Sequence, residues 1–217
     1  VNSASPSQQQ LSNLLEHYQN GRFSDAEKLA LEIIQDFPKE QFAWKVLGAV
    51  LEATGKKYEA LEANQKAVTL STQDTEAHSN LGNTLKELGR LEEALASYNQ
   101  AIALKPDYAE AYSNLGITLK ELGRLDEAEA SYRQAIELKP DYVKAYSNLA
   151  NTLKELGRLD EAEASYRQAI ALKPDFAEAH SNLAVTLKEL GRLDEALASY
   201  AQAIVLKPDL AQAHVNL

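Results

Sequence analysis

The chain of 217 residues contains no cysteine and no methionine, and it has a single tryptophan. Without cysteine it can form neither disulfides nor thiolate metal sites. No apolar run approaches the ~20 residues that a membrane-spanning helix needs. The opening residues, Val1 to Pro6, lack the basic and then apolar pattern of a secretion signal. We therefore expect no membrane insertion; the compartment stays open, with a cytoplasmic location favoured.

Positive charge is also scarce, because 22 Lys and Arg stand against 32 Asp and Glu, which gives a net charge of −10. A surface this acidic repels phosphate backbones, so nucleic acid is not an expected partner. The chain shows no nucleophile beside a base, no glycine-rich phosphate loop and no cluster of metal ligands. We expect no catalytic residue, no cofactor and no metal in this chain.

What the chain does contain is a repeat. Residues 143–176 differ from residues 109–142 at only 6 of 34 positions. The same 34-residue frame divides the chain without insertions into units 7–40, 41–74, 75–108, 109–142, 143–176 and 177–210, followed by a partial unit, 211–217. Residues 1–6 are expected to be a disordered lead-in. Self-similarity at a fixed period is typical of one array of stacked units rather than of a globular core.

Each unit is expected to form two helices. In unit 109–142, small and apolar residues recur at helical spacing over 111–122 and again over 125–138. Gly123 can close the first helix in the left-handed backbone conformation. Pro140 cannot continue the second helix and disfavours helical geometry before it. The pattern predicts a helix, a tight turn and a second helix.

Aspartates before the first helices predict side-chain caps. Asp107 and Asp175 each precede a glutamate by three residues, which is the spacing of a capping box. Asp141 and Asp209 occupy the same place, so they are expected to keep the cap.

At three positions of the unit, the size of the residue is kept in all four close copies. Small residues recur at two of them and tyrosine at the third. The sets are Gly82, Gly116, Ala150 and Ala184; Ala94, Ala128, Ala162 and Ala196; and Tyr98, Tyr132, Tyr166 and Tyr200. Small residues let two helix backbones approach closely, and we expect the tyrosine rings to fill the space beside them.

These positions resemble the signature of the tetratricopeptide repeat (TPR) family. In unit 109–142 the matching residues are Tyr112, Leu115, Gly116, Leu119, Gly123, Ala128, Tyr132, Ala135 and Pro140. The resemblance covers residues 7–217. It implies an all-α, right-handed superhelical solenoid of antiparallel helix pairs, with the first helices lining a concave face. It also implies a protein-interaction scaffold that holds extended segments of partner proteins.

The sequences of the later units are most similar to the repeats of O-linked N-acetylglucosamine transferase and of bacterial TPR proteins like it. That resemblance implies an asparagine ladder that holds the backbone of a bound peptide. The matching residues are Asn80, Asn114, Asn148, Asn182 and Asn216. Val46 and Ser12 stand at this position in the first two units, so the ladder is expected from the third unit onward.

The same face follows from spacing alone. In unit 75–108, residues from Glu76 to Glu87 form a polar stripe that includes Ser79, Asn80 and Asn83. An asparagine amide offers both donors and an acceptor, which complements a peptide bond. Variable positions of the stripe would give selectivity; they are Asn83, Ile117, Asn151 and Val185. A lysine follows in each unit: Lys86, Lys120, Lys154 and Lys188.

Simpler interpretations stay open for these residues. Recently duplicated units can carry copied surface residues, and the asparagines can bond neighbouring helices rather than a ligand. Each lysine is followed by a glutamate, which favours a charge-balanced surface over a carboxylate clamp. His78, His180 and His214 could suggest a metal, but they occupy a position that Tyr112 fills elsewhere and are whole repeats apart. We interpret them as packing residues.

The sequence therefore predicts a non-catalytic module that binds extended peptide segments of other proteins on its concave face. One alternative is that it is the substrate-recruiting arm of a larger glycosyltransferase-like enzyme, with catalysis outside residues 1–217. A third hypothesis is self-association through uncapped terminal repeats.

Overall fold

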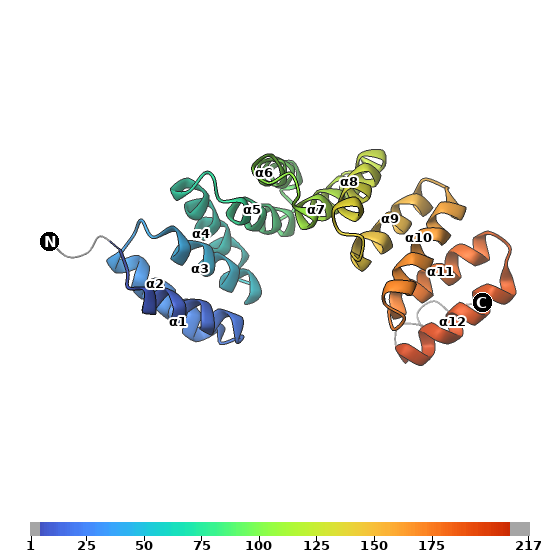
Figure 1. Cartoon of the computed structure of the whole chain (residues 1–217), viewed down its shortest axis with the longest axis horizontal. Helices are drawn as coiled ribbons and strands as arrows, with labels where there is room; N and C mark the ends of the chain where they lie inside the picture. The colour runs from blue at the N-terminus through green and yellow to red at the C-terminus, as the bar shows by residue number, and fades with distance from the viewer. Residues whose placement is uncertain (1–4, 209–217) are drawn as a thin grey trace. The chain divides into compact units, whose positions relative to one another are not determined.

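The structure is a computed structural model, and it describes residues 5–208. Twelve α-helices and no strand are present in this range, and Figure 1 shows them following one another in pairs. Their bounds are α1 Gln8–Gln19, α2 Phe23–Asp36, α3 Gln41–Ala53, α4 Lys57–Leu70, α5 Thr75–Glu87, α6 Leu91–Leu104, α7 Ala109–Glu121, α8 Leu125–Leu138, α9 Val143–Glu155, α10 Leu159–Leu172, α11 Ala177–Glu189 and α12 Leu193–Leu206. These helices confirm the predicted all-α class, and from α5 onward each first helix starts 34 residues after the previous one.

The helices form two compact units, Val1–Pro106 and Asp107–Leu217. Within each, the two helices of a pair pack most extensively against each other, and every second helix packs against the first helix of the next pair. First helices also touch from pair to pair, as α7 touches α9 and α9 touches α11. Among the described residues, second helices are set farther apart. We call the exposed side of the first helices the inner face.

The turn inside each pair is closed as the glycines predict. Gly123 adopts φ 73°, in the left-handed region that side chains disfavour. Its N–H donates to the carbonyl of Lys120, and the N–H of Arg124 donates to the carbonyl of Leu119, at 2.9 Å each. These bonds satisfy carbonyls that the helix end would otherwise leave without a partner.

The predicted aspartate caps are wrong for the described close copies. The residues at the N-cap of α7, α9 and α11 are Tyr108, Tyr142 and Phe176, and none of them caps with its side chain. Asp107, Asp141 and Asp175 stand one position too early and lie in the preceding turn. Asp74 stands one position later in its unit, and there its carboxylate does accept the N–H of Ala77 at 2.9 Å. Asp209 lies outside the described residues.

Tyrosine rings fill the inside of the pairs α5–α6, α7–α8 and α9–α10, as the matched sizes predict. Tyr98, Tyr132 and Tyr166 are fully buried. A Cβ added at Gly116 would lie 2.7 Å from Cε1 of Tyr132, and one at Gly82 would lie equally close to Tyr98. The close approach of the two helices thus depends on the small residue.

Ala128 offers a test of this packing. Its side chain is fully buried, and substitution by leucine should overpack the contact between α7 and α8 and lower the free energy of unfolding by about 1–3 kcal/mol. The matched control is Ala130→Leu on the exposed side of the same helix, which should change stability by less than about 0.5 kcal/mol. Urea denaturation compares the two; equal losses would contradict the packing argument.

Candidate functional site

The inner face carries the predicted polar stripe, with one correction. On α5, Glu76 and Glu87 are less buried than Ser79, and Asn80 and Asn83 are half-buried. The equivalent serines of the later units, Ser113, Ser147 and Ser181, are buried as well. The amides and the charged residues are therefore less covered than the serines.

The ladder asparagines Asn80, Asn114, Asn148 and Asn182 stand at the same place on α5, α7, α9 and α11, and all are half-buried. The backbone carbonyl of each accepts the hydroxyl of the threonine four residues later, at 2.9–3.2 Å. These buried threonines are satisfied within their own helix, so they do not need the asparagine amides. Asn216 lies outside the described residues.

Two of the predicted selectivity residues accept hydrogen bonds from buried tyrosine side chains. The hydroxyl of Tyr98 donates to Oδ1 of Asn83 at 2.8 Å, and that of Tyr166 donates to Oδ1 of Asn151 at 2.5 Å. Asn151 also accepts from Nδ2 of Asn182, the ladder residue of the next pair, at 3.3 Å. Asn151 thus joins the buried packing of one pair to the ladder of the next.

The other two selectivity positions are apolar and half-buried: Ile117 on α7 and Val185 on α11. Neither has a side-chain acceptor that could hold a neighbouring amide.

The lysines support the charge-balanced interpretation at Lys120. Its Nζ, on α7, lies 2.8 Å from Oε1 of Glu155 on α9. The two side chains are partly exposed, so the pair adds little stability. Lys86 and Lys154 are half-buried and Lys188 is exposed.

In unit 41–74 the inner face is acidic where later units carry lysine. Glu52 at this position is partly buried beside Thr84 and Glu87. Burial, together with the charge of Glu87, raises the pKa of Glu52 to about 7, although Thr84 and two lysines act in the opposite direction. Nearby, Asn64 replaces the packing tyrosine and donates to Thr84 at 2.9 Å.

His78 and His180 each bond to a backbone carbonyl in the turn before their helix. Nε2 of His78 lies 3.1 Å from the carbonyl of Thr72, and Nε2 of His180 lies 3.0 Å from that of Pro174. Nε1 of Trp44 donates to the carbonyl of Pro38 in the same way. Within the part of the chain that the structure describes, no group of three or more His, Cys, Asp or Glu could hold a metal ion. His214 lies outside that part.

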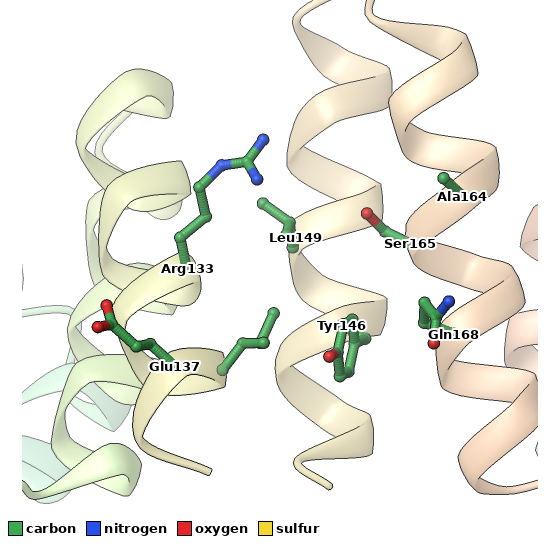
Figure 2. A pocket seen from close by; sticks show the side chains of 8 residues that line it. Arg133, Glu137, Tyr146, Leu149, Ala164, Ser165 and Gln168 are labelled. Carbon is green, nitrogen blue, oxygen red and sulfur yellow. The ribbon is translucent and has the colours of Figure 1, made fainter. Parts of the chain in front are cut away.

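Sequence reasoning missed two pockets on the side away from the inner face. The first, of about 340 Å³, opens between α8 and α10 over α9, and the second, of about 380 Å³, lies one unit later. Figure 2 shows Tyr146 and Leu149 on the middle helix, with Arg133 and Glu137 on one side and Ser165 and Gln168 on the other. We call these the outer pockets. The distance between second helices that opens them cannot be derived from the pattern of a single unit.

Sequence reasoning also missed ion pairs that join consecutive second helices. Glu129 on α8 binds Arg133 of its own helix and Arg158 at the start of α10. Glu161 on α10 binds the same two arginines, which closes a ring of four charges. An equivalent ring joins α10 to α12. The glutamate three residues after each of these arginines can be recognised in the sequence. The glutamate one unit away that binds the same arginine cannot.

Family models described as TPR repeat match residues 82–123, 118–157, 150–191 and 186–217, and a tetratricopeptide repeat model matches residues 13–75. Together they span most of the chain, which therefore belongs to the tetratricopeptide repeat family. A comparison with curated protein sequences gives no match. No helix within residues 5–208 has both the length and the apolar character that crossing a membrane requires.

Solved structures show the same fold. PilW, described as a widely conserved type IV pilus biogenesis factor, is 22% identical, and the match covers 94% of this chain and 96% of PilW with a TM-score of 0.85. Pseudomonas aeruginosa PilF is 19% identical over 92% of this chain and 90% of PilF, at 0.81. YrrB, described as a TPR protein with an unusual peptide-binding site, is 23% identical over 87% and 98%, at 0.68.

The acidic site at Glu52 makes stability depend on pH. An ordinary glutamate has a pKa of 4.5, so between that value and about 7 the folded chain binds the Glu52 proton more tightly than the unfolded chain. This contribution is complete below pH 4.5 and is lost as the pH rises through 7. Glu52→Gln removes the ionisation, so the variant should gain stability over the parent as the pH rises.

Chemical denaturation of both proteins at a series of pH values measures this difference. Exposed Glu92→Gln is the control and should show no such trend. Parallel pH profiles for Glu52→Gln and the parent would contradict the raised pKa.

Proposed function

We propose that the inner face binds an extended segment of a partner protein, with the ladder asparagines bonding to its backbone. The observation that carries this proposal is that a half-buried amide recurs at the same place on α7, α9 and α11, and that these first helices touch one another in turn. Amides repeated in this way can serve peptide bonds at intervals along an extended segment, whatever side chains it carries.

The bonding within the ladder favours one orientation of the amide. Nδ2 of Asn182 is directed toward Asn151, which leaves its Oδ1 as the acceptor for a peptide N–H. Asn151 is in turn fixed by the hydroxyl of Tyr166. A ladder amide that is already oriented loses less rotational freedom when a ligand binds.

Selectivity then comes from the alternation of side chains beside the ladder. Ile117 and Val185 offer apolar contact, while Asn151 between them is occupied by hydrogen bonds. This arrangement suits a segment with apolar side chains at two places that flank a polar one. Lys120 is paired with Glu155, so a bound carboxylate is not the main feature recognised.

Relatives support a binding role in general terms. YrrB is described as having a peptide-binding site, and it shares the fold over 87% of this chain. The substrate-recruiting arm of a larger glycosyltransferase-like enzyme stays a prediction, and its test is whether such an enzyme activity accompanies the protein.

The double variant Asn114→Ala with Asn148→Ala tests the ladder. Each lost hydrogen bond costs about 0.5–1.5 kcal/mol, so affinity for a peptide selected from a displayed random library should fall roughly tenfold or more. Thermal unfolding should be nearly unchanged. Fluorescence anisotropy of the labelled peptide measures the affinity.

The matched control removes two amides from the opposite side. Gln168 and Gln202 line the outer pockets and come from α10 and α12. Gln168→Ala with Gln202→Ala should leave the affinity unchanged. Loss of binding in this control alone would move the site to the outer pockets, and unfolding of the ladder variant without a change in affinity would make the asparagines structural.

A further inference from the structure

In unit 143–176 one position of the inner face holds an oxygen that accepts two hydrogen bonds. Oδ1 of Asn151 on α9 accepts from the hydroxyl of Tyr166 at 2.5 Å and from Nδ2 of Asn182 on α11 at 3.3 Å. One unit earlier, on α7, Ile117 stands at the same position and offers no acceptor. Unit 109–142 therefore lacks the oxygen that would accept these bonds.

The two donors are nevertheless present around Ile117. Tyr132 on α8 and Asn148 on α9 stand where Tyr166 and Asn182 stand one unit later. Asn148 is half-buried, and its backbone carbonyl accepts from a threonine of its own helix. Among residues 5–208, neither the hydroxyl of Tyr132 nor Nδ2 of Asn148 has a hydrogen-bond partner. Two donors thus flank a position from which the acceptor is missing.

The packing of its ring fixes the place of the Tyr132 hydroxyl. A Cβ added to the glycine opposite the ring would lie 2.7–2.9 Å from ring atoms in α7–α8, and the distances in α5–α6 are the same. In α5–α6 the hydroxyl of Tyr98 donates to Oδ1 of Asn83, at 2.8 Å. The hydroxyl of Tyr132 therefore stands where its counterpart meets an asparagine oxygen.

This hydroxyl keeps its proton and is not closed off from a ligand. Burial of the ring raises the pKa of Tyr132 well above its usual range, and the charges of Glu121 and Glu155 act in the same direction. The hydroxyl is therefore a donor at neutral pH. It is not one of the polar atoms of the described residues that are both unpartnered and sealed from solvent, which belong to His17, Asn64 and Ser181.

We propose that an amide oxygen of the bound segment takes the place of the missing asparagine oxygen and accepts from Tyr132 and Asn148 together. The inference rests on the proposed function, because it needs a segment on the inner face. An amide oxygen has two lone pairs, so it can serve both donors. A ligand carboxylate is disfavoured, because Glu121 and Glu155 would repel it.

Tyr132→Phe tests the site, because it removes only the hydroxyl. Affinity for the labelled peptide selected from the random library should fall about threefold to tenfold. Without peptide, the free energy of unfolding in urea should not fall, whereas Tyr166→Phe should lower it through loss of the bond to Asn151. Tyr146→Phe, at an outer pocket, is the matched control for affinity and should bind like the parent.

Ile117→Asn tests whether both donors act on one oxygen. The new asparagine should accept both bonds internally, as Asn151 does, and raise the free energy of unfolding. In this background Tyr132→Phe should cause no further loss of affinity. An equal loss in both backgrounds overturns the inference. So does a destabilisation by Tyr132→Phe as large as that by Tyr166→Phe, since the hydroxyl would then have a partner within the chain.

Peptide variants identify the source of the oxygen. Each Asn or Gln of the selected peptide is replaced in turn by alanine. If one replacement leaves Tyr132→Phe without effect, the oxygen belongs to that side chain; if none does, it belongs to the peptide main chain. Unchanged affinity in Asn114→Ala with Asn148→Ala overturns the proposed function itself. Loss of affinity in that variant, with Tyr132→Phe binding like the parent, overturns only the present inference.

Discussion

The contact between a buried tyrosine ring and a small residue on the facing helix sets the geometry of this chain. Tyr132 is fully buried against Gly116, and Tyr98 is fully buried against Gly82. Once the ring occupies that space, the pair has no further interior of its own, and the rest of its apolar surface must be covered by the next pair. Stacking within each compact unit, and the inner face that stacking exposes, both follow from this.

Packing and recognition are not independent in such a unit. The hydroxyl of Tyr166 emerges from the packed interior and fixes Asn151, which holds the amide of Asn182. Where Ile117 replaces asparagine, this connection is missing. In unit 41–74 the ring itself is replaced by Asn64, and a polar cluster that includes Glu52 takes its place. A change in one core residue therefore reaches the surface chemistry nearby.

The sequence was sufficient for features that depend on residues within one unit. Helix periodicity, the turn at Gly123 and the match of Tyr132 with Gly116 are local, and the structure confirms them. The predicted N-caps were wrong by one position, because the aspartate lies in the turn before each helix and not at its N-cap. The ion rings and outer pockets depend on which residues of consecutive units meet, and an isolated unit does not contain that information. The role of the ladder stays a prediction because it depends on a ligand.

The ion pairs between second helices have a consequence for how such a chain can change in length. Every second helix from unit 41–74 onward is preceded by a cation: Lys56, Arg90, Arg124, Arg158 and Arg192. Lys56, Arg158 and Arg192 each meet a glutamate of the unit before: Glu27, Glu129 and Glu163. Arg90 and Arg124 bind Glu93 and Glu127 of their own unit. Loss or gain of a 34-residue module among the last units would thus bring together surfaces that already fit. Unequal recombination between neighbouring copies could shorten or extend the protein without requiring a new kind of contact between units.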